Sequence, residues 1–183
     1  MKSLIASIRL VIVTLLICVA GYTALILGFA QIVTPHTAEG SLIKDQSGKI
    51  VGSRLIAQSF TNASYFWPRP SAVNYNAAGA GGSNKSPTST NLTERAQQLV
   101  EQYGASVAKP LPANLVAASG GGLDPHITEH AALYQVERVA KARGLPPAQV
   151  EALIKRHAFA PGGALTPDRL VNVLELNLAL DNP

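Results

Sequence analysis

The chain has one cysteine and few charged residues, and both shortages exclude classes of function. Cys18 is the only cysteine and lies inside a long apolar run, so the rest of the chain can form neither a disulfide nor a thiolate metal site. Asp, Glu, Lys and Arg together make up only 14% of the residues. Because Lys and Arg are nowhere clustered densely enough to neutralise a nucleic-acid backbone, we expect no nucleic-acid partner.

Motifs for common enzymatic chemistry are also missing. The glycines at 120–122 precede a helical pattern, but no Lys-Ser or Lys-Thr follows them, as a P-loop requires. No GxSxG segment marks a nucleophilic serine. His126 and His130 are four residues apart, yet they do not form HExxH. We therefore expect no catalytic residue and no metal ligand. The two histidines are interpreted as part of a polar helix start, with a metal-binding pair on one helix face as the alternative.

A long apolar run near the N-terminus is the most distinctive feature that is present. Residues 10–33 contain no Asp, Glu, Lys, Arg or His. About 20 apolar residues in a helix, at a rise of about 1.5 Å each, match the ~30 Å hydrocarbon core of a bilayer. A cleaved signal peptide is the alternative, with Gly28-Phe29-Ala30 as its cleavage site, but such peptides have apolar cores of only ~7–15 residues. The run predicts an uncleaved transmembrane helix.

Charges on the two sides of this run predict its direction. Lys2 and Arg9 precede the run without an acidic residue between them, whereas both signs of charge follow it. Basic residues favour the cytoplasmic side. We therefore expect a cytoplasmic N-terminus over residues 1–9, a single span over 10–33, and an extracytoplasmic domain over 34–183. Without Lys2 and Arg9 the 15 basic residues fall to 13 against 11 acidic ones, so this domain is nearly neutral.

Small residues repeat along one face of the predicted span. Ala20, Ala24 and Gly28 follow a small-xxx-small spacing, which lets a second helix backbone approach closely. Gly and Ala are also simply common in membrane helices. We treat contact with a partner helix at these three residues as a hypothesis.

The rest of the chain has the pattern of one α+β domain that is mostly helical and contains a short β-hairpin. Two short strands, 41–43 and 50–51, flank a turn at 45–48. Apolar residues at helical spacing predict further helices. These helices cover 52–60, 91–103, a segment from Asp124 or Thr128 to Arg143, a segment opened by Pro146-Pro147, and 166–180.

The last of these elements can be read as a strand or as a helix. As a strand, its polar residues Asn172 and Glu175 would fall on opposite faces and break the alternation. As a helix, Asn172, Glu175 and Ala179 form one narrow outward stripe, and Thr166-Pro167 supplies an N-cap followed by proline. The pattern favours a helix that is buried on most sides.

An irregular segment, 65–87, combines aromatic residues with prolines and glycines. Tyr65, Phe66, Trp67 and Tyr75 fall within eleven residues, a density unlike that of a flexible linker. Pro68 and Pro70 remove backbone donors and favour extended geometry. The segment therefore predicts an ordered loop, which either packs over the core of its own domain or contacts a partner.

Several motifs along the chain together resemble one protein family. They are GSRLIAQ at 52–58, YFWPRPSA at 65–72, GSN at 82–84, SGGGLDPHI at 119–127, VERVAKARGL at 136–145 and VNVLELNLALD at 171–181. In this order they resemble the KdpC family, the C subunits of the bacterial and archaeal high-affinity potassium-transporting ATPase. The resemblance covers nearly the whole chain.

The resemblance implies a place in a four-part complex of the cell membrane. The other parts are a channel-like potassium-binding subunit, a P-type ATPase subunit and a small single-helix subunit. It implies a non-catalytic subunit that assembles the complex and acts as a catalytic chaperone, raising the ATP affinity of the ATPase subunit. The chain itself has no DKTG phosphorylation motif, no P-loop and no selectivity-filter repeat.

The resemblance also implies a candidate ATP contact, and the aromatic segment offers candidate partner contacts. A proposed LSGGQ-like ATP motif of the family is matched here only by Leu145 and Gln149, since Pro146, Pro147 and Ala148 replace its Ser-Gly-Gly. The alternative for Gln149 is a solvent-facing residue in the first turn of a helix. ATP is cytoplasmic, whereas the charges place Gln149 outside, so we favour an influence on ATP that passes through partner subunits. Trp67 and Arg69 are the candidate contacts in the aromatic segment. A membrane-anchored envelope hydrolase using His126 or His130, or an anchored binding domain without a pump, are the alternative functions.

Overall fold

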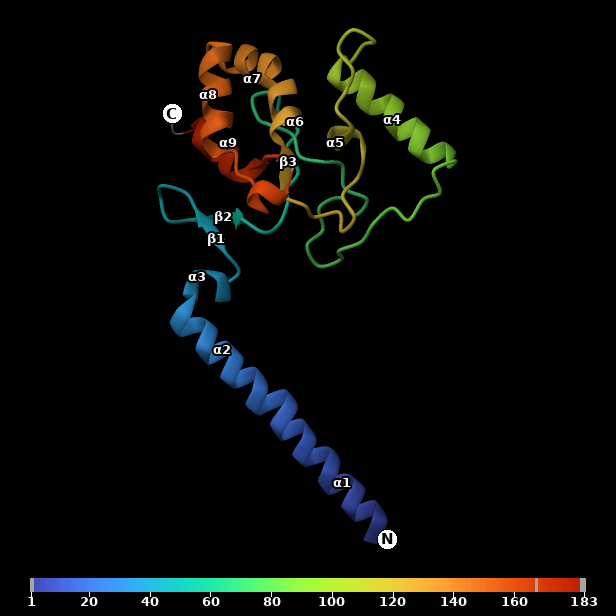
Figure 1. Cartoon of the computed structure of the whole chain (residues 1–183), viewed down its shortest axis with the longest axis vertical. Helices are drawn as coiled ribbons and strands as arrows, with labels where there is room; N and C mark the ends of the chain where they lie inside the picture. Colours follow the sequence, from blue (N-terminus) through green and yellow to red (C-terminus); the bar gives the residue numbers. More distant parts are fainter. Residues whose placement is uncertain (1, 167, 182–183) are drawn as a thin grey trace. The chain divides into compact units, whose positions relative to one another are not determined.

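The computed structural model describes residues 2–166 and 168–181, and the chain divides into two compact units, one ending at Leu42 and one beginning at Ile43. The first unit is one continuous helical segment made of α1 (Lys2–Leu15), the π-helix η1 (Leu16–Gly21) and α2 (Tyr22–Val33), followed by the single turn α3 (Pro35–Ala38) (Figure 1). Apart from the half-buried Ala30, the apolar residues of α1, η1 and α2 are exposed. By length and composition this is a helix that can cross a membrane.

The helix is longer than the predicted span because it begins at Lys2 rather than at residue 10. In η1 the hydrogen bonds reach five residues back, so that the N–H of Tyr22 donates to the carbonyl of Ile17. Gly21 permits this wider turn, since a Cβ at that position would lie 3.3 Å from the carbonyl oxygen of Leu16.

The second unit begins with the predicted hairpin. Strands β1 (Leu42–Lys44) and β2 (Ile50–Ser53) pair in a two-stranded sheet. Asp45 holds the turn, since its Oδ1 accepts hydrogen bonds from the backbone N–H of Ser47 and of Lys49 and from the Ser47 hydroxyl. Gly48 closes the turn with a positive φ of 82°, which glycine adopts without steric cost.

The prediction of a helix over 52–60 is wrong, because no helix forms there. Strand β2 continues to Ser53, and the chain then runs through a turn into an extended segment. Partners that are distant in sequence satisfy this backbone, because the N–H of Ala57 donates to the Leu123 carbonyl at 2.9 Å. The Gln58 amide also folds back over Gly52 and donates to the Val51 carbonyl at 2.8 Å.

Helix α4 (Thr90–Tyr103) is confirmed, including its end at Gly104, whose φ of 61° is left-handed. The short helix α5 (Ala113–Val116) follows. In Figure 1, α4 lies on one side of the second unit and α6 to α9 on the other, with α5 and irregular segments between them. The segment 65–87 has no helix or strand, as predicted.

The helix predicted from Asp124 or Thr128 to Arg143 is three elements. Strand β3 (His126–Thr128) comes first, then α6 (Glu129–Tyr134), and after a break at Gln135 comes α7 (Val136–Arg143). The Thr128 hydroxyl caps α6 by accepting from the N–H of Ala131. The strand forms because residues 126–128 pair antiparallel with β4 (Leu170–Asn172), with Ile127 opposite Val171.

The helix predicted over 166–180 is therefore wrong at residues 166 and 168–172, of which 170–172 are strand β4, and correct from Val173, where α9 (Val173–Asp181) begins. Asn172 does not face outward but is only 2% exposed. Its Nδ2 donates to the Arg54 carbonyl at 2.8 Å, and its Oδ1 caps α9 by accepting from the Glu175 N–H. Of the proposed Thr166-Pro167 start, Pro167 lies outside the described residues. The Thr166 hydroxyl instead accepts from the Gly162 N–H.

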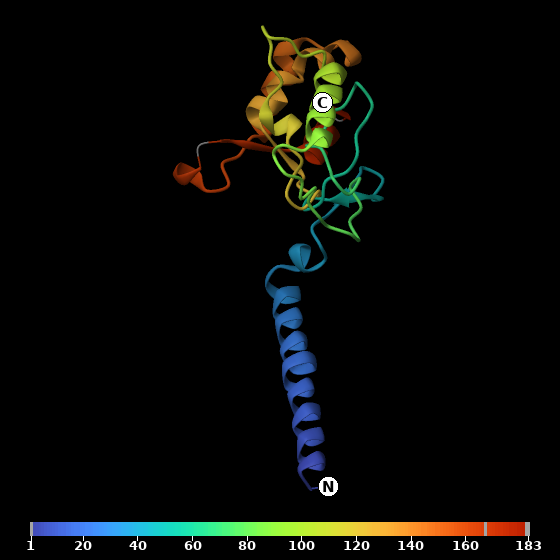
Figure 2. The same ribbon diagram turned by 90° about the vertical axis from the view of Figure 1, so that its right-hand side faces the viewer.

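The predicted helix at Pro146-Pro147 is α8 (Pro147–His157), and a 3₁₀ turn, η2 (Gly163–Leu165), lies in the loop that follows it. This loop extends away from the helices (Figure 2). Helices α6 to α9 and the β3–β4 pair enclose the core. Its largest fully buried apolar side chains are Phe66, Leu115, Ile127, Ile154, Leu176, Val139, Val150 and Val171.

Candidate functional site

Two buried side-chain amides fix the aromatic segment at 65–70 against the helices. Asn177 of α9 holds Phe66, whose N–H donates to Oδ1 at 2.8 Å while Nδ2 donates to the Phe66 carbonyl at 3.0 Å. Gln135 holds Trp67 in the same way, at 2.8 and 3.1 Å. Both amide residues are only 1% exposed. The segment thus has its buried backbone groups satisfied without being part of a sheet.

Arg138 of α7 covers the outer side of this segment. Its guanidinium lies 3.8 Å from the centre of the Trp67 ring, a cation–π arrangement. It also donates to the carbonyls of Ala63 and Tyr65, at 2.6 and 2.9 Å. Burial lowers the pKa of Arg138 to about 10, so the group is still charged at neutral pH.

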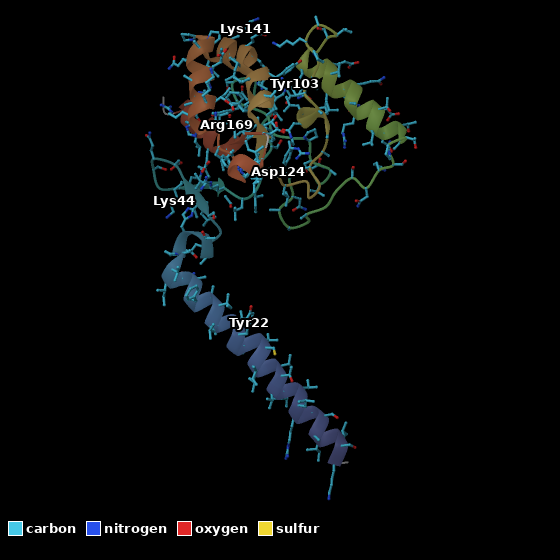
Figure 3. The ribbon with its side chains drawn as sticks, viewed as in Figure 1. Tyr22, Lys44, Tyr103, Asp124, Lys141 and Arg169 are labelled. Carbon is cyan, nitrogen blue, oxygen red and sulfur yellow. The ribbon has the colours of Figure 1, made fainter. Side chains whose placement is uncertain are left out.

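Tyr103, at the end of α4, contacts the Trp67 ring edge to face, with the ring centres 5.1 Å apart. Figure 3 shows Tyr103 on the side of α4 that faces α6 and α7. Burial raises the pKa of the Tyr103 hydroxyl, so it stays protonated. The Trp67 side chain is therefore held by residues of its own unit, and its indole N–H donates to the Asn62 carbonyl at 2.9 Å.

Arg69 joins the segment to the loop before β3. Its guanidinium forms an ion pair with Asp124 at 3.0 Å and donates to the carbonyls of Ala117 and Ala118. The other carboxylate oxygen of Asp124 accepts from the His126 N–H at 3.0 Å. Burial acts to raise the pKa of Asp124, but the hydrogen bonds from His126 and Arg69 outweigh it and lower this pKa below its usual value.

The two candidate histidines do not share a helix face. His126 lies in β3 with its ring 5.4 Å from that of Phe159, and His130 is exposed on α6. Interpreting both as one helix start was therefore wrong, because strand pairing takes up residue 126. Within residues 2–166 and 168–181, no group of three or more His, Cys, Asp or Glu side chains lies close enough to hold a metal ion.

Gln149 lies in the first turn of α8 and is exposed. It lines a groove of about 320 Å³ between α8 and α9, together with Leu145, Arg156 and Ala179. The groove is mostly apolar, and Arg156 is its only charged lining residue. In the first unit, Ala20 lies in η1 and the other two small residues, Ala24 and Gly28, lie in α2. All three are exposed.

The sequence pattern missed the residues that hold the aromatic segment. Asn177 interrupts a run of leucines, and a polar residue inside an apolar run is a signal that could have marked it as a buried hydrogen-bonding group. Gln135 stands at the break between α6 and α7, within a stretch that was predicted as one helix, so nothing marked it in advance.

Comparison with known proteins confirms the family resemblance. A family model described as K+-transporting ATPase, c chain (KdpC), matches residues 4–182. The potassium-transporting ATPase KdpC subunit of Parvibaculum lavamentivorans is 66% identical over 181 residues, which cover 99% of this chain and 97% of that protein. The KdpC subunits of Geobacter metallireducens and Burkholderia orbicola are 43% and 46% identical, each over 99% of this chain and over 98% and 97% of those proteins. The chain therefore belongs to the KdpC family of K+-transporting ATPase c chains.

Proposed function

We propose that this chain is a non-catalytic accessory subunit of an ATP-driven potassium import system. The observation that carries the proposal is its sequence similarity, over nearly its whole length, to proteins named potassium-transporting ATPase KdpC subunits. The sequence supports a non-catalytic role, since it has none of the motifs for ATP hydrolysis or potassium conduction. Its partners in this proposal are a channel-like potassium-binding subunit, a P-type ATPase subunit and a small single-helix subunit.

In this proposal the helix Lys2–Val33 crosses the cell membrane once, with the N-terminus in the cytoplasm and the domain outside. The exposed apolar surface and the length of the helix support the span, and the positions of Lys2 and Arg9 support its direction. The small residues Ala20, Ala24 and Gly28 would then pack against a membrane helix of a partner subunit.

The subunit assembles the complex and, as a catalytic chaperone, raises the ATP affinity of the ATP-hydrolysing subunit. We propose that this influence passes through the partner subunits rather than through a direct ATP contact at Gln149. A triphosphate needs several positive groups or free backbone N–H groups around it, whereas the groove beside Gln149 offers one charged residue, Arg156. The proposed external placement of the domain agrees with this, because ATP is cytoplasmic.

We also propose that the surface around Trp67 and Arg69 contacts a partner. Both side chains bind groups of their own unit, so a partner would meet the surface that they shape rather than two free side chains. Replacing Trp67 by Phe keeps an aromatic ring between Arg138 and Tyr103, so the domain should stay folded. Loss of partner binding by this folded variant would then indicate a partner contact rather than a folding role.

Co-purification tests the assembly role. An affinity-tagged copy of this chain is isolated from detergent-solubilised membranes of cells grown at low potassium, and the bound proteins are identified. The proposal expects the ATP-hydrolysing and potassium-binding subunits in stoichiometric amounts, and expects their association with each other to weaken when this chain is deleted. A pump that assembles fully without the chain would contradict the proposal.

A further inference from the structure

The groove between α8 and α9 is a surface feature that the folding of this chain does not explain. Its floor consists of Val150, Leu153 and Leu180, which are 1%, 8% and 4% exposed. Ala152 and Ala179 line it as well, and their small side chains leave its space unfilled. The volume of about 320 Å³ lies in the range of pockets that accept a ligand or a partner side chain.

An uncompensated charge lies on this groove. Arg156 is exposed in the last turn of α8, and no ion pair or hydrogen bond of its side chain is found within residues 2–166 and 168–181. Asp181, the acidic residue at the end of α9, is held instead by Arg143 at 2.7 Å and by the Tyr65 hydroxyl at 2.9 Å. Arg156 is thus available to a carboxylate from outside the chain.

We infer that this groove docks an apolar segment of another subunit of the same transport complex, with an aliphatic side chain in the groove and a carboxylate on Arg156. An amphipathic helix is the simplest such segment, because its apolar residues at i, i+3 and i+4 fit a groove between two helices. Gln149, near the first turn of α8, would accept or donate one hydrogen bond to the segment's backbone. The inference rests on the proposed assembly role and names the surface that serves it.

The lining favours a protein segment over a nucleotide. An adenine ring could enter an apolar groove, but a triphosphate would meet only one cation here. At the start of α8, the N–H groups of Gln149 and Val150 already donate to the Pro146 carbonyl. A second copy of this chain is a poor fit, because a symmetric contact would place two Arg156 side chains near one another without a carboxylate between them.

Filling the groove is the first test. Ala152→Trp places a large side chain in the groove from an exposed position on α8, and Ala142→Trp is the matched control on the exposed face of α7. Each tagged full-length variant is purified from membranes with its partner subunits. The inference expects Ala152→Trp to lose most of the bound subunits while Ala142→Trp retains them, with the same thermal midpoint for both purified chains in detergent. Normal assembly of Ala152→Trp would overturn the inference.

Site-specific labelling is the second test and does not depend on a large side chain. Cys18→Ser removes the native thiol, and a single cysteine is then introduced as Ala152→Cys or, for the control, Ala142→Cys. The inference expects maleimide to label residue 152 about tenfold more slowly in the complex than in the isolated full chain, with residue 142 labelled equally in both. Equal rates at residue 152 would overturn it. Protection by ATP in the isolated chain would also overturn it, in favour of a nucleotide site.

Substitutions of Arg156 test the inferred contact with a carboxylate. Arg156→Glu is expected to weaken assembly and Arg156→Lys to retain it, because the inferred partner group is a carboxylate. If deletion of the whole chain leaves the pump assembled, the proposed function itself fails. If deletion breaks the complex but all groove variants assemble normally, only the groove inference fails.

Discussion

The side chain of Asn177 satisfies both backbone polar groups of Phe66. The Phe66 N–H donates to Oδ1 at 2.8 Å, and Nδ2 donates to the Phe66 carbonyl at 3.0 Å, across 111 positions of sequence. Both residues are almost completely buried, with exposures of 1% and 0%. This pair fixes the aromatic segment to α9, and so connects an early part of the second unit to its last helix.

Asn177→Leu should therefore destabilise the fold strongly. A leucine keeps the volume but leaves a backbone N–H and a backbone carbonyl buried without partners, at a cost of about 2–5 kcal/mol in all. Trp67 is the only tryptophan and is the next residue after Phe66, so its fluorescence reports the loss directly. Urea unfolding of the full chain in detergent measures the midpoint, which should fall well below that of wild type. Gln97→Leu, on the exposed face of α4, is the control, and equal midpoints for the two variants would contradict the role given to Asn177.

The contacts of the Asp124 carboxylate with His126 and Arg69 predict an acid-sensitive contribution to stability. The pKa of Asp124 is lowered in the folded state, so the folded form binds this proton less readily than the unfolded form. The contribution is then present above the unfolded pKa of about 3.9 and is lost as the pH falls through the folded pKa. Asp124→Asn should remove it and flatten the dependence of the free energy of unfolding on pH below about pH 4.

Urea midpoints measured between neutral pH and the acid limit test this expectation. Asp168→Asn, an exposed acidic position, is the control and should keep the wild-type slope. An Asp124→Asn variant whose stability falls as steeply in acid as that of wild type would show that the contacts of the Asp124 carboxylate with His126 and Arg69 contribute nothing to this dependence.

The small-residue face of α2 predicts an effect on assembly without an effect on the folded domain. Ala24→Leu and Gly28→Leu add bulk where close approach of another helix is proposed. A Cβ at Gly28 meets nothing within 4 Å in this chain, so the change causes no internal clash. The amount of partner subunit that co-purifies should decrease for both variants, whereas Val19→Leu, a small change of volume, should leave it unchanged. Full recovery of partners with Gly28→Leu would exclude this face as a contact.

The proposed direction of the span predicts where Gln149 can be labelled. In a Cys18→Ser background, Gln149→Cys should react with a membrane-impermeant maleimide at the outer face of the cell membrane, because the position is exposed on α8. Cells with a permeabilised outer layer and an intact cytoplasmic membrane are the sample, and a cytoplasmic protein thiol is the negative control. Protection of residue 149 until the cytoplasmic membrane is lysed would reverse the orientation and restore direct ATP contact as a candidate.

Local signals predicted much of the fold. The Asp45–Gly48 turn determines a hairpin, Gly104 ends a helix through its left-handed φ, and Pro147 begins one, and each feature acts within a few residues. The family motifs predicted membership of the KdpC family, which the comparisons confirmed.

Non-local contacts produced the errors. Residues 126–128 form a strand because β4 lies beside them, and Gln58 folds over Gly52 where a helix was predicted. Neither contact can be inferred from local periodicity, because each partner is selected by the whole tertiary structure. The same reason explains why Gln135 and Asn177 were missed, since a buried amide is recognised only from the backbone that it binds.

The potassium-stimulated ATPase activity of the purified pump, measured against ATP concentration with and without this chain, tests the central claim most directly. The account predicts that the pump lacking the chain needs a higher ATP concentration for half-maximal activity, or fails to assemble, and that adding back the wild-type chain restores both properties. Equal ATP dependence and equal assembly in the two preparations would contradict the claim that this chain is an assembling and activating subunit.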